Sequence, residues 1–133
     1  DQAYINSLKY NPDNTLVLNN YSYYLSNREE NLFKALEMME TCIELTIDEP
    51  NASYLDTYAW VLYKLEKYDL ARPQIEGALL LSPNNPVLLE HYGDILYKLG
   101  FLEKSVLEWR KALKLDPGNS KLENKINQQS LNE

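Results

Sequence analysis

Apolar residues recur at helical spacing along most of the chain. Two segments repeat the spacing i, i+3, i+4 and i+7, which places side chains on one face of a helix: Leu55, Tyr58, Ala59 and Leu62, and then Leu89, Tyr92, Gly93 and Leu96. A second helix is predicted after each first one, over 32–45, 70–81 and 102–115. No Asn-Gly or Asp-Gly turn separates alternating runs, so the pattern predicts an all-α chain.

The chain also repeats itself at a period of 34 residues. Aligning 52–85 with 86–119 gives 11 identities in 34 positions. The identical pairs are Leu55/Leu89, Tyr58/Tyr92, Leu62/Leu96, Tyr63/Tyr97, Lys64/Lys98, Leu65/Leu99, Ala78/Ala112, Leu79/Leu113, Leu81/Leu115, Pro83/Pro117 and Asn85/Asn119. An earlier, longer copy begins near Thr15, with one extra residue in the turn at 28–31 and two more near 46–50.

Small residues occupy positions where two antiparallel helices must approach each other closely. They lie on the first helices (Ser22, Ala59, Gly93) and as pairs seven residues apart on the second helices (Ala35/Cys42, Ala71/Ala78, Ser105/Ala112). Prolines follow the second helices at Pro50, Pro83 and Pro117, as expected of a residue that cannot continue a helix.

These residues together resemble the tetratricopeptide repeat family, whose 34-residue pattern the three copies match in order. The matching positions are Leu18, Tyr21, Ser22, Leu25, Ala35, Met39, Cys42 and Pro50; Leu55, Tyr58, Ala59, Leu62, Ala71, Ile75, Ala78 and Pro83; and Leu89, Tyr92, Gly93, Leu96, Ser105, Trp109, Ala112 and Pro117. The resemblance implies a right-handed superhelical solenoid of antiparallel helix pairs. A narrower likeness is to the tandem repeats of bacterial envelope proteins.

The domain plan predicted from the repeats has five parts. Residues 1–14 read as part of a helix from a preceding repeat, which indicates a segment of a longer array; 15–50, 51–85 and 86–119 are three full repeats; and 119–133 is a capping helix with a frayed tail. Leu122 and Ile126 would face inward from the cap.

The resemblance implies a concave groove lined by the first helices. After the packing positions are removed, the residues predicted to line this groove are Asn19, Tyr23, Ser26, Asp56, Trp60, Tyr63, Lys64, Glu90, Asp94, Tyr97 and Lys98. The carboxylates among them favour a cationic or Arg-containing segment of another protein, which could stack on the aromatic rings. Trp60 has an alternative role, packing against a neighbouring helix.

Composition and charge narrow the partner classes. The chain has 133 residues and a net charge of −7, with 13 basic and 20 acidic side chains, so its summed field disfavours nucleic acid as a partner. No apolar run approaches the roughly 18 residues of a membrane-spanning helix. A periplasmic or outer-membrane-tethered location is slightly favoured over the cytoplasm by the envelope-protein likeness alone.

The sequence offers few residues for catalysis or cofactor binding. His91 is the only histidine and Cys42 the only cysteine, so we expect no two-histidine metal site, no serine–histidine pair and no internal disulfide. No phosphate-binding glycine motif occurs. We therefore expect no enzyme, no metal, no cofactor and no small-molecule substrate.

Some family members hold a chaperone's C-terminal carboxylate with Lys, Asn and Arg, and the sequence argues against that role here. The corresponding positions carry Asn19, Tyr23, Ser53, Thr57, Val87 and His91, without a Lys or Arg.

The functional hypothesis is a protein-interaction scaffold or adaptor that binds a peptide or helical segment. The alternative is a structural spacer or self-association module, including a homodimer, within a longer repeat protein. Pro73 and Gly77 are unfavourable residues inside the second helix of the second repeat. Two explanations are open: a bend that the helix tolerates, or the close approach of another chain to this face.

Overall fold

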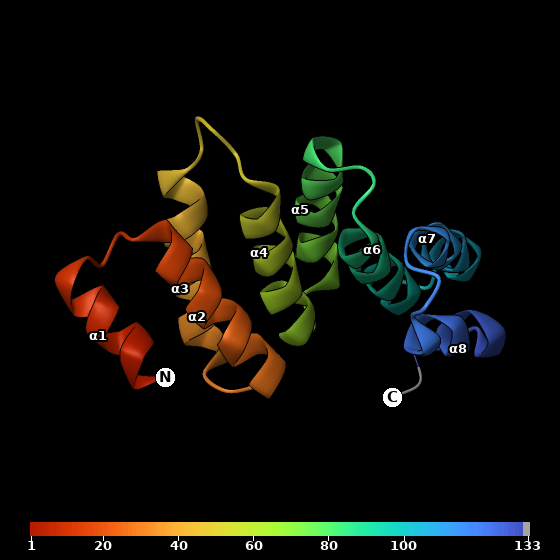
Figure 1. Ribbon diagram of the computed structural model, residues 1–133, viewed down its shortest axis with the longest axis horizontal. Coiled ribbons are helices and arrows are strands. Elements are labelled where there is room, and N and C mark those ends of the chain that lie inside the picture. Colours follow the sequence, from red (N-terminus) through yellow and green to blue (C-terminus); the bar gives the residue numbers. More distant parts are fainter. Residues whose placement is uncertain (132–133) are drawn as a thin grey trace. The chain divides into compact units, whose positions relative to one another are not determined.

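The computed structural model describes residues 1–131. Within that range helices are the only regular secondary structure, and there is no strand (Figure 1). Its eight helices are α1 (Gln2–Tyr10), α2 (Thr15–Arg28), α3 (Leu32–Leu45), α4 (Ala52–Lys64), α5 (Tyr68–Leu81), α6 (Pro86–Lys98), α7 (Leu102–Leu115) and α8 (Ser120–Gln128). None of these helices is long and apolar enough to cross a membrane. The all-α prediction is confirmed.

The predicted second helices of the three repeats agree closely with the observed α3, α5 and α7. Helices α3 and α7 have the expected bounds, whereas α5 begins at Tyr68, two residues earlier than expected. Pro73 is therefore the sixth residue of α5 and lies inside the helix. Because proline has no N–H, the carbonyl of Asp69 loses its usual intrahelical partner there.

Asparagine side chains fix the starts of four helices. Asn14, Asn51, Asn85 and Asn119 precede α2, α4, α6 and α8, and each side-chain oxygen accepts a backbone N–H from the first turn. Such caps contribute about 1 kcal/mol each relative to alanine. The sequence analysis used Pro50, Pro83 and Pro117 to mark where helices end. The asparagines that follow these prolines mark where the next helices begin.

The chain divides into two compact units, residues 1–67 and residues 68–133. The boundary falls inside the predicted second repeat. In the first unit, α1 packs on α2, α2 packs on α3, and α4 packs on both α2 and α3 (Figure 1). One buried cluster of this unit contains Leu18, Tyr21, Leu25, Ala35, Met38, Met39, Cys42 and Val61.

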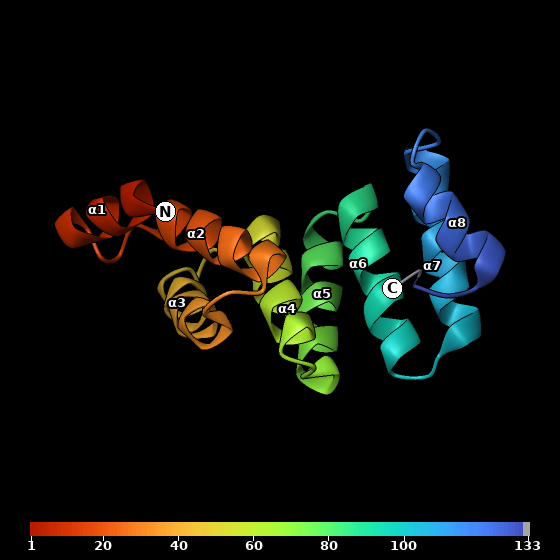
Figure 2. The same ribbon diagram turned by 90° about the horizontal axis from the view of Figure 1, so that it is seen from below.

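In the second unit, α6 packs against α5 and α7, and α8 packs against α7 (Figure 2). One buried cluster of this unit contains Leu89, Val106, Trp109, Ala112, Leu122 and Ile126. Leu122 and Ile126 of α8 point inward, as predicted, so α8 covers the apolar face left by α7.

One connection in the first unit is longer than its later counterparts, but it is not the α2–α3 turn. That turn covers 29–31 and has the same length as the turns at 65–67 and 99–101. The extra residue predicted there lies instead in α2, which has 14 residues where α4 and α6 each have 13. The α3–α4 connection runs from Thr46 to Asn51 and is seen at the top of Figure 1. It forms one wall of a cavity described below.

Candidate functional site

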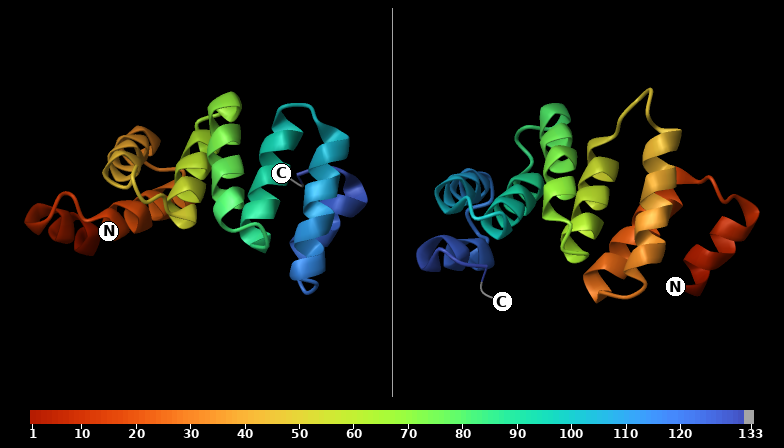
Figure 3. Two further views of the ribbon diagram at one scale, coloured as in Figure 1. Left: turned by 90° about the horizontal axis from the view of Figure 1, so that it is seen from above. Right: turned by 180° about the vertical axis from the view of Figure 1, so that it is seen from behind.

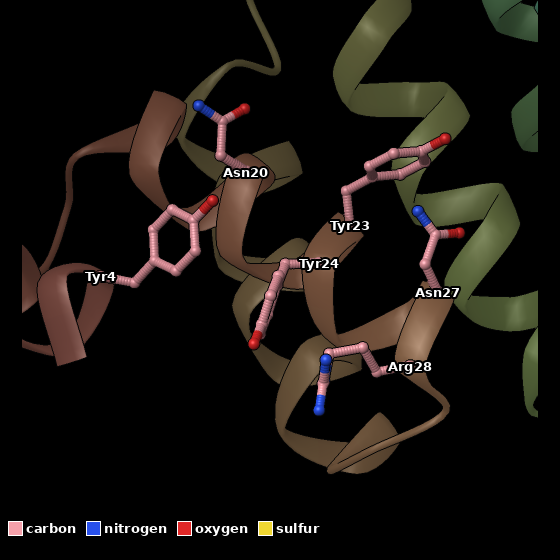
Figure 4. A pocket seen from close by; sticks show the side chains of 6 residues that line it. All are labelled: Tyr4, Asn20, Tyr23, Tyr24, Asn27 and Arg28. Carbon is pink, nitrogen blue, oxygen red and sulfur yellow. The ribbon is translucent and has the colours of Figure 1, made fainter. Parts of the chain in front are cut away.

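The open pocket of the first unit lies between α1 and α2 (Figure 4). It has a volume of about 370 Å³ and is lined by Tyr4, Asn20, Tyr23, Tyr24, Asn27 and Arg28. The lining offers aromatic rings, two carboxamides and one guanidinium, and no carboxylate. Such groups bind peptides by stacking and by hydrogen bonds to the backbone.

The aromatic side of the pocket is held by contacts between the two helices. The ring of Tyr4 stacks on Tyr21 at 5.1 Å and meets Tyr24 at 5.8 Å. The Arg28 guanidinium lies 5.3 Å from the centre of the Tyr24 ring, and its Nε lies 3.2 Å from Glu30 Oε1. Tyr24 is thus packed between Tyr4 and Arg28.

The amide side of the pocket is oriented from beneath. Asn19 is buried, and its Nδ2 donates to Asn20 Oδ1 at 3.3 Å. This bond engages the Asn20 carbonyl and leaves its amino group to donate to a ligand. Asn27 lies two turns further along α2, with Tyr23 between them (Figure 4).

Of the predicted groove residues in the first unit, only Tyr23 lines this pocket. Asp56 and Tyr63 are buried side chains of α4. Trp60 is half-buried, and its ring stacks on Tyr63 at 4.6 Å and lies 5.2 Å from Lys64 Nζ. These Trp60 contacts lie within α4, whereas the alternative predicted for Trp60 was packing against a neighbouring helix.

Lys64 itself is directed to a surface contact. Its Nζ lies 3.5 Å from Glu29 Oε1, in the turn before α3. Ser26, on the predicted groove face of α2, is fully buried, and its Oγ donates to the Tyr23 carbonyl at 2.7 Å.

The structure changes the expectation for Glu90 and Asp94. Sequence reasoning placed both carboxylates on an open surface, but Lys125 of α8 reaches them. Its Nζ lies 2.7 Å from Glu90 Oε2 and 3.0 Å from Asp94 Oδ1. Asp94 is only 4% exposed and also accepts the indole N–H of Trp109 at 3.0 Å. The chain's own cation occupies the place predicted for a partner's cation.

Two carboxylates control the protonation of Lys125. Burial lowers the pKa of this lysine, but the charges and hydrogen bonds of Asp94 and Glu90 outweigh that effect and leave the pKa above its ordinary value. Lys125 is therefore charged at neutral pH. Asn119 adds to the cluster by donating to Glu90 Oε1 at 3.3 Å.

Tyr97 and Lys98, the other predicted groove residues of the second unit, differ in exposure. The Tyr97 ring is half-buried and stacks on Trp109 at 5.9 Å, whereas Lys98 is exposed.

The sequence reasoning missed Tyr4, Asn20, Asn27 and Arg28. A signal for two of them was present, because Asn20, Tyr23 and Asn27 follow the spacing i, i+3, i+7 that places side chains on one face of α2. The contribution of Tyr4 could not be read in this way, because it depends on how α1 packs.

The lone cysteine lies in the core. Burial raises the pKa of Cys42 to about 11, so its thiol is protonated at neutral pH and is a poor nucleophile. Across residues 1–131, no group of three or more His, Cys, Asp or Glu side chains is placed to hold a metal ion.

Comparison with known proteins gives one curated relative and several solved structures. The chain is 30% identical over 102 residues to the DnaJ homolog subfamily C member 7 homolog of Schizosaccharomyces pombe, a match that covers 76% of this chain and 21% of that protein. The chain thus spans about a fifth of the relative's length. No family model matches the sequence.

The solved structures share the fold at low sequence identity. The first TPR of Spaghetti (RPAP3), bound to an HSP90 peptide, has a TM-score of 0.77 at 17% identity, covering 86% of this chain and 89% of that one. MamA has a TM-score of 0.79 at 17% identity, covering 96% and 73%. YrrB, described as a TPR protein with an unusual peptide-binding site, has a TM-score of 0.77 at 20% identity, covering 96% and 64%.

Proposed function

Since this chain has the fold of the tetratricopeptide-repeat proteins, we propose that it is a protein-interaction module that binds an extended segment of another protein in the pocket between α1 and α2. The open pocket with its aromatic and amide lining is the observation that carries this proposal. Two of the similar structures support it, since one holds a peptide and the other is described by its peptide-binding site.

The spacing of the two carboxamides fits an extended backbone. Asn20 and Asn27 are seven residues apart on α2, a rise of about 10.5 Å along a helix. Three residues of an extended chain span about the same distance. The Asn20 amino group can donate to a peptide carbonyl, and the Asn27 carboxamide can both donate to a peptide carbonyl and accept a peptide N–H, while Tyr23 stacks on a side chain between them.

The charge of the pocket sets a preference among peptides. Arg28 is its only charged lining residue, and Glu30 already pairs with its guanidinium, so a neutral segment is favoured. The expectation of a cationic partner depended on Glu90 and Asp94, which lie on α6 and are already paired with Lys125. The pocket between α1 and α2 has no carboxylate in its lining to attract such a partner.

The test is selection of peptides from a random phage-displayed library, followed by fluorescence anisotropy with the selected synthetic peptides. We expect Tyr23→Ala to weaken binding at least tenfold, about 1.4 kcal/mol, and Asn27→Ala to weaken it several-fold. Tyr10→Ala is the matched control, since Tyr10 is 94% exposed on α1 and does not line the pocket.

The proposal is wrong if no peptide is selected at millimolar affinity or better. It is also wrong if Tyr23→Ala and Tyr10→Ala bind the selected peptides equally well. Circular dichroism of each variant separates a lost contact from a lost fold.

A second candidate function, self-association, is favoured by an exposed apolar stripe on α5. Leu70, Pro73 and Leu80 are exposed and share one face with Gly77, and Leu80 is 86% exposed. Sedimentation velocity over a range of concentrations tests it. A dimer that Leu80→Ser dissociates supports this function, and a monomer at every concentration excludes it.

A further inference from the structure

A small apolar cavity lies where α3 ends and α4 begins, in the first unit. It has a volume of about 110 Å³ and is lined by Ile43, Thr46, Ile47, Pro50, Asn51 and Leu55. The long connection that forms one wall is visible from the opposite side in the right panel of Figure 3. The extra residues near 46–50, for which the later repeats have no counterpart, build this wall.

The size and lining of the cavity suit one aliphatic side chain. Apolar cavities of roughly 150 Å³ in proteins accommodate benzene, so a cavity of this size takes a leucine or isoleucine side chain. One lining residue, Ile47, is 66% exposed and adds apolar surface that an inserted side chain would cover.

Exposed carboxylates lie close to the cavity residues in sequence. They are Glu44 at the end of α3 and Asp48 and Glu49 in the connection, with Glu37 and Glu40 earlier on α3. From Ala35 to Tyr63 the sequence contains no Lys or Arg. Within the described part of the chain, none of the five carboxylates forms an ion pair.

The three glutamates of α3 lead toward the cavity. Their spacing, i, i+3 and i+7, places them on one face of the helix. Burial and the Glu40 carboxylate together raise the pKa of Tyr58 on α4. Asp48 directly follows the lining residue Ile47 in sequence, and Glu44 directly follows the lining residue Ile43.

We propose that this cavity is a docking site for a cationic segment of another protein, which inserts one aliphatic side chain between α3 and α4 and places Lys or Arg side chains against these carboxylates. The aliphatic anchor provides the buried contact, and the charges provide orientation and a fast association rate. The site shares no residue with the pocket between α1 and α2, so it does not depend on the function proposed above.

The probe is a synthetic decapeptide of lysine, arginine and glycine with one central leucine. Its matched control replaces that leucine by serine. Binding to the intact chain is followed by ¹⁵N–¹H correlation spectra at about 50 mM and 150 mM salt, where the screening length changes from roughly 14 to 8 Å. We expect shifts concentrated at Ile43, Ile47, Asn51 and Leu55, and at least tenfold weaker binding of the serine peptide.

Two pairs of variants separate the apolar contribution from the charge contribution. Ile47→Ser, in the α3–α4 connection, should weaken binding about tenfold. Phe33→Ser, at an exposed apolar residue of α3, should leave binding unchanged. The double variant Asp48→Lys/Glu49→Lys should weaken it more than Glu29→Lys/Glu30→Lys. The two acidic pairs lie beyond opposite ends of α3, a helix about 21 Å long.

Equal binding of the leucine and serine peptides would overturn the proposal, because the surface would then attract cations without an anchor. Equal loss in the two charge-reversed variants, or shifts confined to the residues of the α1–α2 pocket, would also overturn it. Tyr23→Ala leaves this binding unchanged if the two sites are separate, and thus distinguishes failure here from failure of the proposed function.

Discussion

The helix pairs α2–α3 and α6–α7 solve one packing problem in opposite ways. In the first pair, Ser22 on the leading helix donates its hydroxyl to the carbonyl of Ala35 at 3.3 Å. In the second pair, the corresponding positions hold Gly93 and Ser105, and the hydroxyl of Ser105 donates to the Gly93 carbonyl at 2.7 Å. The hydrogen bond is kept while its donor moves to the other helix.

The difference follows from the large residue that each pair buries. Met39 and Trp109 occupy equivalent positions and are both fully buried. A Cβ at position 93 would overlap the Trp109 indole, so only glycine fits there and the hydroxyl must come from α7. Met39 is more adaptable and leaves room for Ser22. In these two helix pairs the hydrogen bond is therefore kept although the residues that form it differ.

The two units differ equally in their leading-helix faces. The α2 face of the first unit forms part of an open pocket, whereas the α6 face of the second unit is covered by Lys125 of α8. Tyr23, which lines the pocket, and Asp94, which is paired with Lys125, occupy the same position of the repeat.

Among the substitutions that test this comparison, removal of Lys125 should lower the free energy of unfolding most. Lys125→Met leaves Asp94 buried without its cation and should lower the free energy of unfolding by about 3 kcal/mol. Urea denaturation followed by circular dichroism measures it. Adding Asp94→Asn should restore part of the loss; if the double variant is less stable than the single one, the buried charge is not the cause.

A substitution at Gly93 should have the next largest effect. Gly93→Ser copies the Ser22 arrangement into the second unit and should destabilise the native chain by about 2 kcal/mol through overpacking against Trp109. In a Trp109→Met background the same change should cost less than about 1 kcal/mol. Equal costs in the two backgrounds, measured by urea denaturation, would show that the indole does not dictate glycine.

The substitution Tyr92→Phe, tested at alkaline pH, should change the free energy of unfolding least. Burial and the hydrogen bond to Glu76 (2.6 Å) raise the pKa of Tyr92 to about 12 from its ordinary value of 10.0. The neutral phenol therefore stabilises the fold fully below pH 10, and this contribution is lost as the pH rises toward 12. Tyr92→Phe should remove that part of the pH dependence and cost about 1 kcal/mol at pH 7.

Urea denaturation at several values between pH 8 and about pH 11 measures the Tyr92 effect. Tyr21→Phe is the matched variant, since the Tyr21 ring holds the equivalent position in the first unit and stacks on Tyr4. An unchanged pH profile in Tyr92→Phe would assign the alkaline loss to other groups, such as Lys125.

Helical periodicity and the 34-residue repeat were enough to predict the all-α class and the bounds of α3 and α7. These features depend on contacts within a helix or between sequential helices, which leave a regular trace in sequence. The prediction of surface residues was less successful, because it assumed that nothing covers Glu90 and Asp94. Lys125, more than 30 residues away, covers them, and spacing along one helix carries no sign of that contact.

By itself, the sequence determined the all-α class, where the helices lie and which small residues permit close approach, since each follows from local periodicity and side-chain volume. Only the tertiary structure decided which polar residues remain open. Exposure depends on what packs above a side chain: Tyr4 and Asn20 meet in a pocket because α1 lies beside α2, and Asp94 is closed because α8 folds over it.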